Sequence, residues 1–368
     1  MHRIYVHRKG IVQFLLLLTA VLSLAWGAAH REPISALAQP APTATIADGP
    51  VAVFFSRPPA FDGRYEGGPD EILARAVGMA GRSIDIAVYD FDLLSVARAL
   101  LGAQQRGVAV RVVVDSDNYY TEALSLLRGA GIPVVGDGRS ALMHDKFVVI
   151  DGGEVWAGSM NLTVNGAYRN DNNLLRIRSA ALADAFTEEF EEMFVHKHFG
   201  AASPAGKPAP AVETACGPVE VLFAPEDSVA RRVTALIAGA RSEIHVLAFS
   251  FTSAEIAGAM LERSRNGVLL SGVLERTQVR SNTGTQFAVL ESAGADVRLD
   301  ANPRNMHHKV ILIDGEIVIA GSYNFTASAE EKNDEDLLIF HDRSLAEAFE
   351  QEFRRIHDQA ATFAFGQW

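Results

Sequence analysis

The chain has 368 residues, of which 48% are hydrophobic and 21% are charged, and its formal net charge at pH 7 is −12. These values exclude a mostly disordered protein, and the length is sufficient for two packed domains. The single cysteine, Cys216, excludes an intramolecular disulfide and a thiolate-rich metal site.

The N-terminal segment has the pattern of an export signal. Arg3, Arg8 and Lys9 precede an apolar run over residues 11–29, an arrangement typical of secretory signal peptides. We therefore expect residues 1–38 to be a cleaved signal peptide of a secreted or periplasmic protein. The run is also long enough to span a bilayer, so an uncleaved N-terminal membrane anchor is the alternative.

Two segments rich in Ala, Pro and Gly divide the remaining chain. Residues 39–50 and 200–218 lack helical or strand periodicity and are predicted to be linkers. They separate two stretches of similar length, residues 51–199 and 219–368, which resemble one another in order and in detail. An internal duplication explains this resemblance.

The first stretch contains a predicted βαβ unit. Residues 83–91 form an apolar strand pattern, residues 94–105 a helical pattern, and residues 108–115 a second strand pattern after Gly107. A further helix is predicted over residues 180–194.

The second stretch repeats this unit, with strands over 243–251 and 268–275, a helix over 254–265, and a later helix over 344–356. Corresponding positions keep one constant separation along the chain, as in the pairs Phe91 and Phe251, Gly107 and Gly267, and Asp115 and Glu275. Apolar strands joined by helical crossovers favour parallel pairing with both faces covered. We therefore expect an α/β fold of two similar repeats, each a mainly parallel sheet flanked by helices, packed as a pseudo-two-fold pair.

Each stretch also carries one copy of the motif H-x-K-x(4)-D-x(6)-G-S-x-N. The first copy consists of His144, Lys146, Asp151, Gly158, Ser159 and Asn161, and the second of His307, Lys309, Asp314, Gly321, Ser322 and Asn324. The separation between corresponding residues is the same for every pair of the motif. The duplicated motif resembles the signature of the phospholipase D superfamily, and the resemblance extends from about residue 51 to 357.

The residue types of the motif suit phosphate chemistry. Side chains at positions i and i+2 of a strand share a face, so each His–Lys pair can point at one anion. Lys146 and Lys309 can neutralise the nonbridging oxygens, and hydrogen bonds from Ser159, Ser322, Asn161 and Asn324 can add to this stabilisation. The two serines can equally well only shape the turn. This chemistry requires neither a metal nor another cofactor.

Two histidines match the two roles that diester cleavage requires, a nucleophile and an acid for the leaving oxygen. The resemblance implies a phosphohistidine intermediate, with His144 as the nucleophile and His307 as the acid and then the base; the residues alone do not fix which is which. Since each half supplies one pair, we expect a single site at the interface of the repeats and activity as a monomer.

The resemblance also implies a carboxylate that orients a catalytic imidazole. Glu335 follows His307 at the interval where the family commonly carries that acid. The residue at the same interval after His144 is Asn172, preceded by Asp171. Either Asp171 substitutes for the missing acid, or the two histidines differ in basicity.

Two further positions of the motif are predicted to support the fold. Asp151 and Asp314 each precede a glycine at the end of an apolar strand, a pattern typical of turns. His308 is expected to point away from Lys309, because neighbouring residues of a strand alternate between faces. We expect no metal ligands in the motif.

The sequence therefore predicts a metal-independent phosphodiester hydrolase of phospholipase D type that releases the head-group alcohol from phospholipids, with a membrane surface as a candidate partner. Export and the acidic composition favour lipid over nucleic acid, because nonspecific binding of long nucleic acids needs clustered Lys and Arg. A secreted or periplasmic endonuclease that uses the same residues is the alternative. The sequence gives less support to two further alternatives, phosphatidyl transfer to another alcohol and a noncatalytic phosphate-binding protein.

Overall fold

The computed structural model describes residues 49–58, 65–204, 211–214 and 217–360. The predicted signal or anchor segment, most of the linker over 39–50, and Cys216 lie outside the described residues. None of the helices in these ranges has the length and apolar character that crossing a membrane requires. The described residues all belong to one compact unit.

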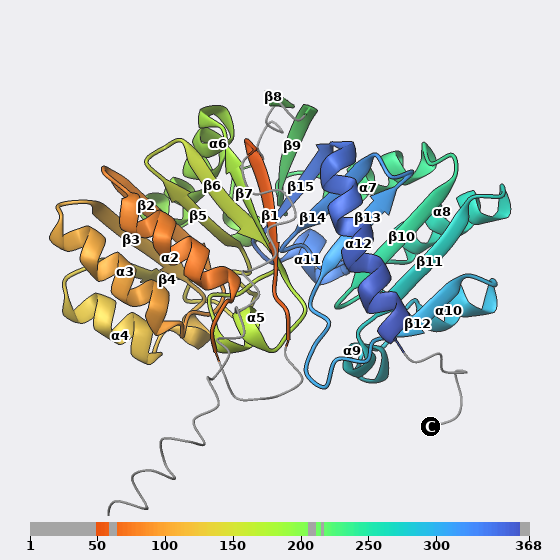
Figure 1. Cartoon of the computed structure of the whole chain (residues 1–368), viewed down its shortest axis with the longest axis horizontal. Coiled ribbons are helices and arrows are strands. Elements are labelled where there is room, and N and C mark those ends of the chain that lie inside the picture. Colours follow the sequence, from red (N-terminus) through yellow and green to blue (C-terminus); the bar gives the residue numbers. More distant parts are fainter. Residues whose placement is uncertain (1–48, 59–64, 205–210, 215–216, 361–368) are drawn as a thin grey trace, which may run out of the picture. The chain divides into compact units, whose positions relative to one another are not determined.

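The first repeat is built on a seven-stranded sheet with the order β1-β7-β6-β5-β2-β3-β4 (Figure 1). Its strands are β1 (Val51–Phe55), β2 (Ser83–Val88), β3 (Ala109–Val114), β4 (Val134–Gly136), β5 (Lys146–Ile150), β6 (Glu154–Gly158) and β7 (Asn173–Arg178). Its helices are α2 (Pro69–Met79), α3 (Leu94–Gln105), α4 (Glu122–Gly129), α5 (Val164–Tyr168) and α6 (Ala180–Glu191).

The second repeat has an eight-stranded sheet with the order β12-β11-β10-β13-β14-β15-β9-β8. Its strands are β8 (Val212–Thr214), β9 (Gly217–Ala224), β10 (Glu243–Ala248), β11 (Leu269–Leu274), β12 (Asp296–Leu299), β13 (Lys309–Ile313), β14 (Ile317–Gly321) and β15 (Glu335–His341). Its helices are α7 (Val229–Ala238), α8 (Ala254–Arg265), α9 (Arg276–Ser281), α10 (Phe287–Ser292), α11 (Ala327–Glu331) and α12 (Arg343–Gln359).

The two predicted βαβ units are confirmed. Strand β2 pairs in parallel with β3, and β10 pairs in parallel with β11. The crossover helices α3 and α8 have the predicted bounds. Helix α6 ends at Glu191, short of the predicted end at residue 194, and a π-helical turn over Glu192–His196 continues it.

The expectation of mainly parallel sheets needs correction, because both sheets are mixed. Parallel pairing is confined to β2-β3-β4 and β10-β11-β12, whereas β5, β6 and β7 pair antiparallel. Strand β6 follows β5 after a short turn, Asp151 to Gly153. So short a connection cannot cross over, and it forces a hairpin.

The predicted linker over residues 200–218 contains regular structure. Strand β8 and the first residues of β9 lie within it and pair antiparallel. The segment was predicted to be a linker because of its Ala, Pro and Gly content. Such residues are nevertheless tolerated in a short strand at the edge of a sheet.

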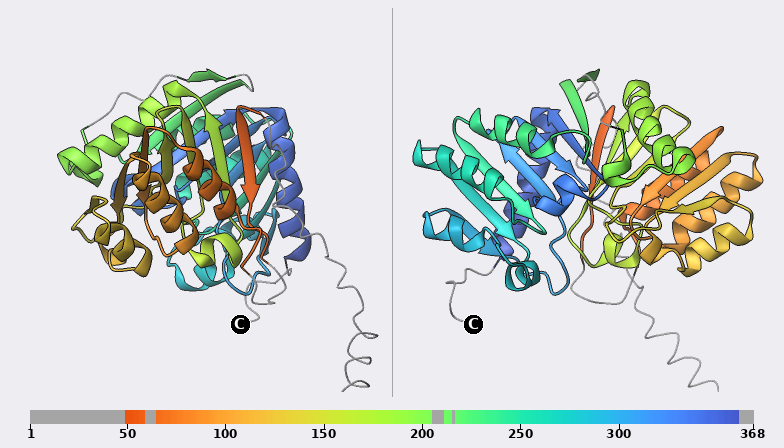
Figure 2. Two further views of the ribbon diagram at one scale, coloured as in Figure 1. Left: turned by 60° about the vertical axis from the view of Figure 1, so that its left-hand side comes forward. Right: turned by 180° about the vertical axis from the view of Figure 1, so that it is seen from behind.

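Helices flank both sheets, and the two repeats share a core. Helices α2, α3 and α4 cover one face of the first sheet, and α7 and α8 cover one face of the second (Figure 1). Helices α6 and α12 pack on the opposite faces, which look toward each other, and α6 also contacts β9 of the other repeat (Figure 2).

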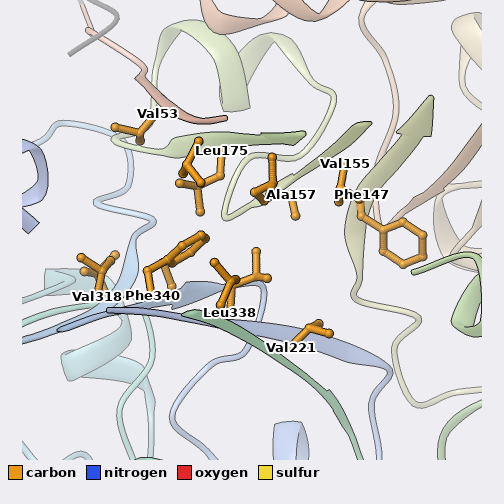
Figure 3. Packing of buried hydrophobic residues seen from close by; sticks show 14 of the residues in the cluster. Val53, Phe147, Val155, Ala157, Leu175, Val221, Val318, Leu338 and Phe340 are labelled. Atoms are coloured by element: carbon orange, nitrogen blue, oxygen red, sulfur yellow. The ribbon is translucent and has the colours of Figure 1, made fainter. Parts of the chain in front are cut away.

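Apolar side chains of both sheets fill the interface between the repeats. Figure 3 shows Val155, Ala157 and Leu175 of the first sheet facing Val318, Leu338 and Phe340 of the second. Burial of the apolar surface of both sheets provides the main driving force that holds the two repeats together. The predicted pairing of two similar α/β repeats is thus confirmed.

Candidate active site

Backbone bonds between the repeats fix the two motif histidines. The amide of His144 donates to the carbonyl of Asp334 at 2.9 Å, and the amide of His307 donates to the carbonyl of Asp171 at 2.9 Å. The bonding segments precede β15 and β7, so each histidine is held by the opposite repeat.

The ring of each histidine is also oriented by the opposite repeat. Nδ1 of His144 lies 2.6 Å from Oε2 of Glu335, and Nδ1 of His307 lies 2.9 Å from Oδ1 of Asn172. Both contacts point Nε2 away from the partner, and both histidines line the same cavity. The duplication of the motif therefore produces one shared site, with the partners exchanged between the halves.

The structure favours one of the two alternatives for Asn172, a difference between the two histidines, over substitution by Asp171. Asp171 does not contact His307 with its side chain, because its carboxylate pairs with Arg355 at 2.5 Å and accepts from Asn302 at 2.7 Å. The amide of Asn172 occupies the position of the acid instead. His144 thus has a carboxylate partner and His307 a neutral one, and the site is asymmetric.

The two motif serines do not line the cavity. The hydroxyl of Ser322 donates to Oε2 of Glu335 at 2.8 Å, and that of Ser159 donates to Oδ1 of Asn172 at 2.9 Å. Both serines are fully buried. These contacts favour the alternative that the two serines shape the site, because they hold Glu335 and Asn172, the partners of the histidines.

The two motif lysines lie beside the histidines, as predicted from the strand alternation. Nζ of Lys146 donates to the carbonyl of His144 at 2.5 Å. Nζ of Lys309 donates to the carbonyl of His307 at 2.9 Å and lies 3.2 Å from its Nε2. Burial lowers the pKa of Lys146 to about 8, and it also lowers the pKa of Lys309. Both ammonium groups are thus poorly solvated and suited to bind an anion.

Burial and positive charge both favour neutral imidazoles. Burial first, and then the neighbouring lysines, lower the pKa of His144 and of His307 well below 6.5. Burial raises the pKa of Glu335 to about 7, although the lysines and hydrogen bonds from Asn333 and Ser322 oppose this shift. A neutral imidazole with its lone pair on Nε2 is the form that can attack phosphorus.

The cavity at the histidines has a volume of about 510 Å³. The motif asparagines, Asn161 and Asn324, line it, as the sequence predicted for substrate-binding residues. The remaining lining is mostly neutral and polar and comes largely from the second repeat, including Ser250, Thr252, Gln278, Asn282, Thr283 and Ser328. Among the described residues, no acidic side chain lines this cavity.

Sequence reasoning missed two aromatic residues of the site. The ring of Tyr89 lies 5.2 Å from that of His144, and the ring of Phe249 lies 4.5 Å from that of His307. Each aromatic ring also lies beside the neighbouring lysine, Nζ of Lys309 being 4.8 Å from the ring of Phe249. Their separation along the chain, equal to that of Phe91 and Phe251, was the available signal.

The motif aspartates support the fold outside the cavity. The carboxylate of Asp151 accepts from the amides of residues 81–83, and that of Asp314 accepts from the amides of residues 241–243. Both adopt positive φ, 53° and 54°, a conformation that Asp tolerates better than most residues. The structural role expected for these residues agrees with this geometry. His308 faces away from the cavity, also as expected, and its Nε2 lies 3.4 Å from Glu352.

Comparison with known proteins identifies the family. The family model described as "Cardiolipin synthase, PLD-like domain" matches residues 73–194 and 233–357. The two matched ranges correspond to the two repeats and together span more than half of the chain.

Individual relatives match about a third of this chain. The mitochondrial cardiolipin hydrolase of Xenopus tropicalis is 38% identical over 117 residues, which are 31% of this chain and 56% of that protein. A phospholipase D of Rickettsia felis is 33% identical over 133 residues, which are 36% of this chain and 66% of that protein. The matches thus span between about half and two thirds of these relatives.

A solved structure covers both repeats. The phosphatidylserine synthase of Haemophilus influenzae superposes with a TM-score of 0.64 at 14% identity, over 84% of this chain and 87% of that one. At this identity the match establishes the two-repeat fold alone. The family model, which covers more than half of the chain, shows that the chain belongs to the phospholipase D superfamily.

Proposed function

We propose that the chain cleaves phospholipids at the head-group phosphodiester through a covalent intermediate on His144, with His307 as general acid and then general base. The observation that supports this division of roles is the unequal partnering of the two rings, Glu335 for His144 and Asn172 for His307.

In the first step, Nε2 of His144 attacks phosphorus and the bond to the head-group oxygen breaks. The imidazole gains positive charge as the P–N bond forms, and the carboxylate of Glu335 at Nδ1 stabilises that charge. Lys146 and Lys309 bind the nonbridging oxygens, and the asparagine amides in the cavity add hydrogen bonds.

His307 donates the proton to the departing oxygen. Its partners, the amide oxygen of Asn172 and the carbonyl of Ser159, are neutral, so they stabilise an imidazolium less than a carboxylate does and leave it a stronger acid. The negative charge of the bound phosphodiester favours protonation of His307 in the complex. In the second step, His307 takes a proton from water, the water oxygen attacks phosphorus, and the P–N bond breaks to release phosphatidate.

The cavity supports a neutral alcohol as the head group. Hydroxyl and amide side chains such as Gln278, Asn282 and Thr283 can hydrogen-bond a polyol such as glycerol. The names of relatives as cardiolipin hydrolase and phospholipase D support a lipid substrate, and the acidic composition is unfavourable for nonspecific binding of long nucleic acids.

A substrate panel tests this proposal. Purified protein is incubated with vesicles of phosphatidylglycerol, cardiolipin or phosphatidylcholine, and separately with single- and double-stranded DNA, at low salt with EDTA present. The expected result is phosphatidate release, fastest from the glycerol-containing lipids and absent in H144A. DNA cleavage without lipid turnover would overturn the proposed substrate and make the chain an endonuclease.

We also propose that the protein acts outside the cytoplasm and as a monomer. The export-like pattern of residues 1–38 supports the location, and the completion of one site by the two repeats of a single chain supports the monomer. Cell fractionation with N-terminal sequencing tests the first statement. Activity that stays proportional to protein concentration on dilution tests the second.

A further inference from the structure

A group of carboxylates lies behind the active site, on the face of β5 that looks away from the cavity. Asp145 follows His144, and the strand alternation directs its side chain to that opposite face. It is fully buried, and neither of its carboxylate oxygens has a hydrogen-bond partner. A buried carboxylate without a partner is costly, so this group indicates a missing ligand.

Three more carboxylates form a cluster, and the charge of Asp145 acts on one of them, Glu189. Glu189 lies near the end of α6, Glu192 in the π-helical turn that follows, and Glu226 two residues after β9. One oxygen from each lies within 4.8 Å of one oxygen from each of the others. Burial and the charges of neighbouring acids, Asp145 foremost among them, raise the pKa of Glu189 well above its usual value.

The packing of α6 on β5 directs Asp145 into this group. Phe147 shares its face with Asp145, and its ring lies 5.0 Å from that of Phe186 on α6. Glu189 lies about one helical turn beyond Phe186, near enough for the charge of Asp145 to act on it. The second repeat shows the same geometry as a direct contact, since His308, the equivalent of Asp145, lies 3.4 Å from Glu352, the equivalent of Glu189.

In the second repeat, cationic side chains neutralise the equivalent region. Glu352 forms ion pairs with Arg57 at 2.5 Å and with Arg355 at 2.7 Å, and it faces His308. Arg57 comes from the first repeat, just beyond β1, so this network joins the two halves. Its charges balance without any added ion.

The first repeat places acids where the second has these cations. At the constant separation of the two motif copies, Asp145 replaces His308 and Glu192 replaces Arg355. Glu226 follows β9 in the second repeat, as Arg57 follows β1 in the first. The two residues therefore lie at similar places in the two repeats. Within the described residues, none of Asp145, Glu189, Glu192 and Glu226 lies within ion-pair distance of an Arg or Lys, and the charges of Lys146 and Arg139 act on Asp145 without such contact.

We propose that Glu189, Glu192 and Glu226 bind a divalent cation of the oxygen-preferring class, with Ca²⁺ favoured over Mg²⁺ and with the charge of the neighbouring Asp145 adding to theirs. Carboxylates from the end of α6 with its π-helical turn and from the segment after β9 suit the irregular coordination of Ca²⁺ better than the strict octahedron of Mg²⁺. The ion supplies on this side the positive charge that Arg57 and Arg355 supply on the other. Since Glu226 belongs to the second repeat, the ion joins the two halves and has no part in bond cleavage.

Calorimetry and thermal unfolding test the proposal. The full chain is stripped with EDTA, dialysed, and titrated with CaCl₂ or MgCl₂. We expect one Ca²⁺ per chain, a dissociation constant no weaker than about 10⁻³ M, and a rise of a few degrees in Tm at saturating Ca²⁺. Absence of binding by either ion at about 10 mM, ten times that limit, would overturn the proposal and show that shared protons neutralise the cluster.

Variants separate an ion site from a merely structural cluster. Glu189→Gln with Glu226→Gln should abolish binding, yet leave the Tm in EDTA equal to or above that of the parent, because it removes repulsion between acids. The single variant E226Q, at a half-buried position, should weaken Ca²⁺ binding at least about tenfold. D184N, at an exposed position on α6, should bind as the parent does. Undiminished Ca²⁺ binding in the double variant or in E226Q would contradict the site.

Discussion

Nδ1 of His144 lies 2.6 Å from a carboxylate oxygen of Glu335, whereas the pseudo-equivalent Nδ1 of His307 lies 2.9 Å from the amide oxygen of Asn172. Each contact crosses from one repeat to the other. A duplication that would otherwise make two equal imidazoles has thus produced two with different partners. Since cleavage needs a nucleophile and an acid with different basicities, our proposal for the roles of the two histidines rests on this one difference.

Replacement of Glu335 by Gln should lower kcat by about 10²- to 10⁴-fold, the range seen when the acid behind a catalytic histidine is neutralised. The amide keeps a hydrogen-bonding group near Nδ1 of His144 but removes the charge that stabilises the forming phosphohistidine. KM should change much less than kcat, because Glu335 does not line the cavity. Steady-state kinetics on a soluble chromogenic phosphodiester measure both.

The matched variant is N172D, which gives His307 a carboxylate partner. It should raise the pKa of His307 and shift the limb of the rate profile that reports protonation of the acid to higher pH. A kcat in E335Q equal to that of the parent would exclude Glu335 as the partner that matters in the rate-limiting step.

Replacement of either histidine by Ala should lower the rate by several orders of magnitude, because one role cannot be covered by the other. The two variants should differ when the leaving group is changed. H307A should release a burst of about one p-nitrophenolate per active site from a p-nitrophenyl diester, because this leaving group needs no protonation while the second step still lacks its base. H144A should show no burst. Intact mass measurement on H307A should also detect the phosphorylated protein.

The opposite result, a burst from H144A and accumulation of the adduct on His307, would reverse the assignment of roles while leaving the shared site in place. Near-normal turnover of an ordinary lipid by either variant would contradict the shared site itself.

Local sequence patterns predicted what depends on local structure. Hydrophobic periodicity predicted the bounds of α3 and α8. Because each helix connects two strands as a crossover, the pattern also predicted that these strands pair in parallel. The pairing of His144 with Lys146 follows from the alternation of a strand, and the turn role of Asp151 from the Asp-Gly pattern.

Contacts between the repeats could not be predicted in the same way. Nothing near His144 indicates that its acid lies in the other half of the chain, since both Glu335 and Asn172 follow a histidine of their own repeat. The contacts of the two motif serines lie within single repeats, Ser159 with Asn172 and Ser322 with Glu335, but the motif spacing alone did not indicate them. The antiparallel pairs of β5, β6 and β7 were missed since the prediction rested on the βαβ unit alone.

The alkaline limb of kcat/KM should lie near pH 8 or below, well under the ordinary range of lysine. Burial lowers the pKa of Lys146 to about 8 and lowers that of Lys309 as well, so these ammonium groups lose their charge, and with it their hold on the phosphate, as pH rises. In the profile of kcat the limb should move to higher pH, because bound anionic phosphodiester favours the charged amines. Coincident limbs in the two profiles would show that the lysines do not titrate.

Asp314 should stabilise the fold at neutral pH but not in strong acid. Burial raises its pKa, but the amides of Ser242, Glu243 and Arg241 and the hydroxyl of Ser242 oppose this, and the net pKa is lowered from 3.8 to about 2. When folding lowers the pKa of an acid, the ionised acid stabilises the fold at pH values above the pKa of the unfolded state. This stabilisation is lost as the pH falls through the pKa of the folded state. D314N should therefore lower the free energy of unfolding at pH 7 by about 1 kcal/mol, less than the full pKa shift corresponds to, because solvent screens this surface turn.

Between about pH 3.8 and 2 that difference between the parent and D314N should shrink toward zero. Urea denaturation at pH 7 and at lower pH values measures it, and Asn is the appropriate replacement because it tolerates the positive φ of 54° at this turn. D151N should show a smaller effect of the same sign, since burial raises the pKa of Asp151 but the same kind of amide contacts lower it further. A difference that stays constant over this pH range would mean that the amide contacts, and not the charge, carry the stabilisation.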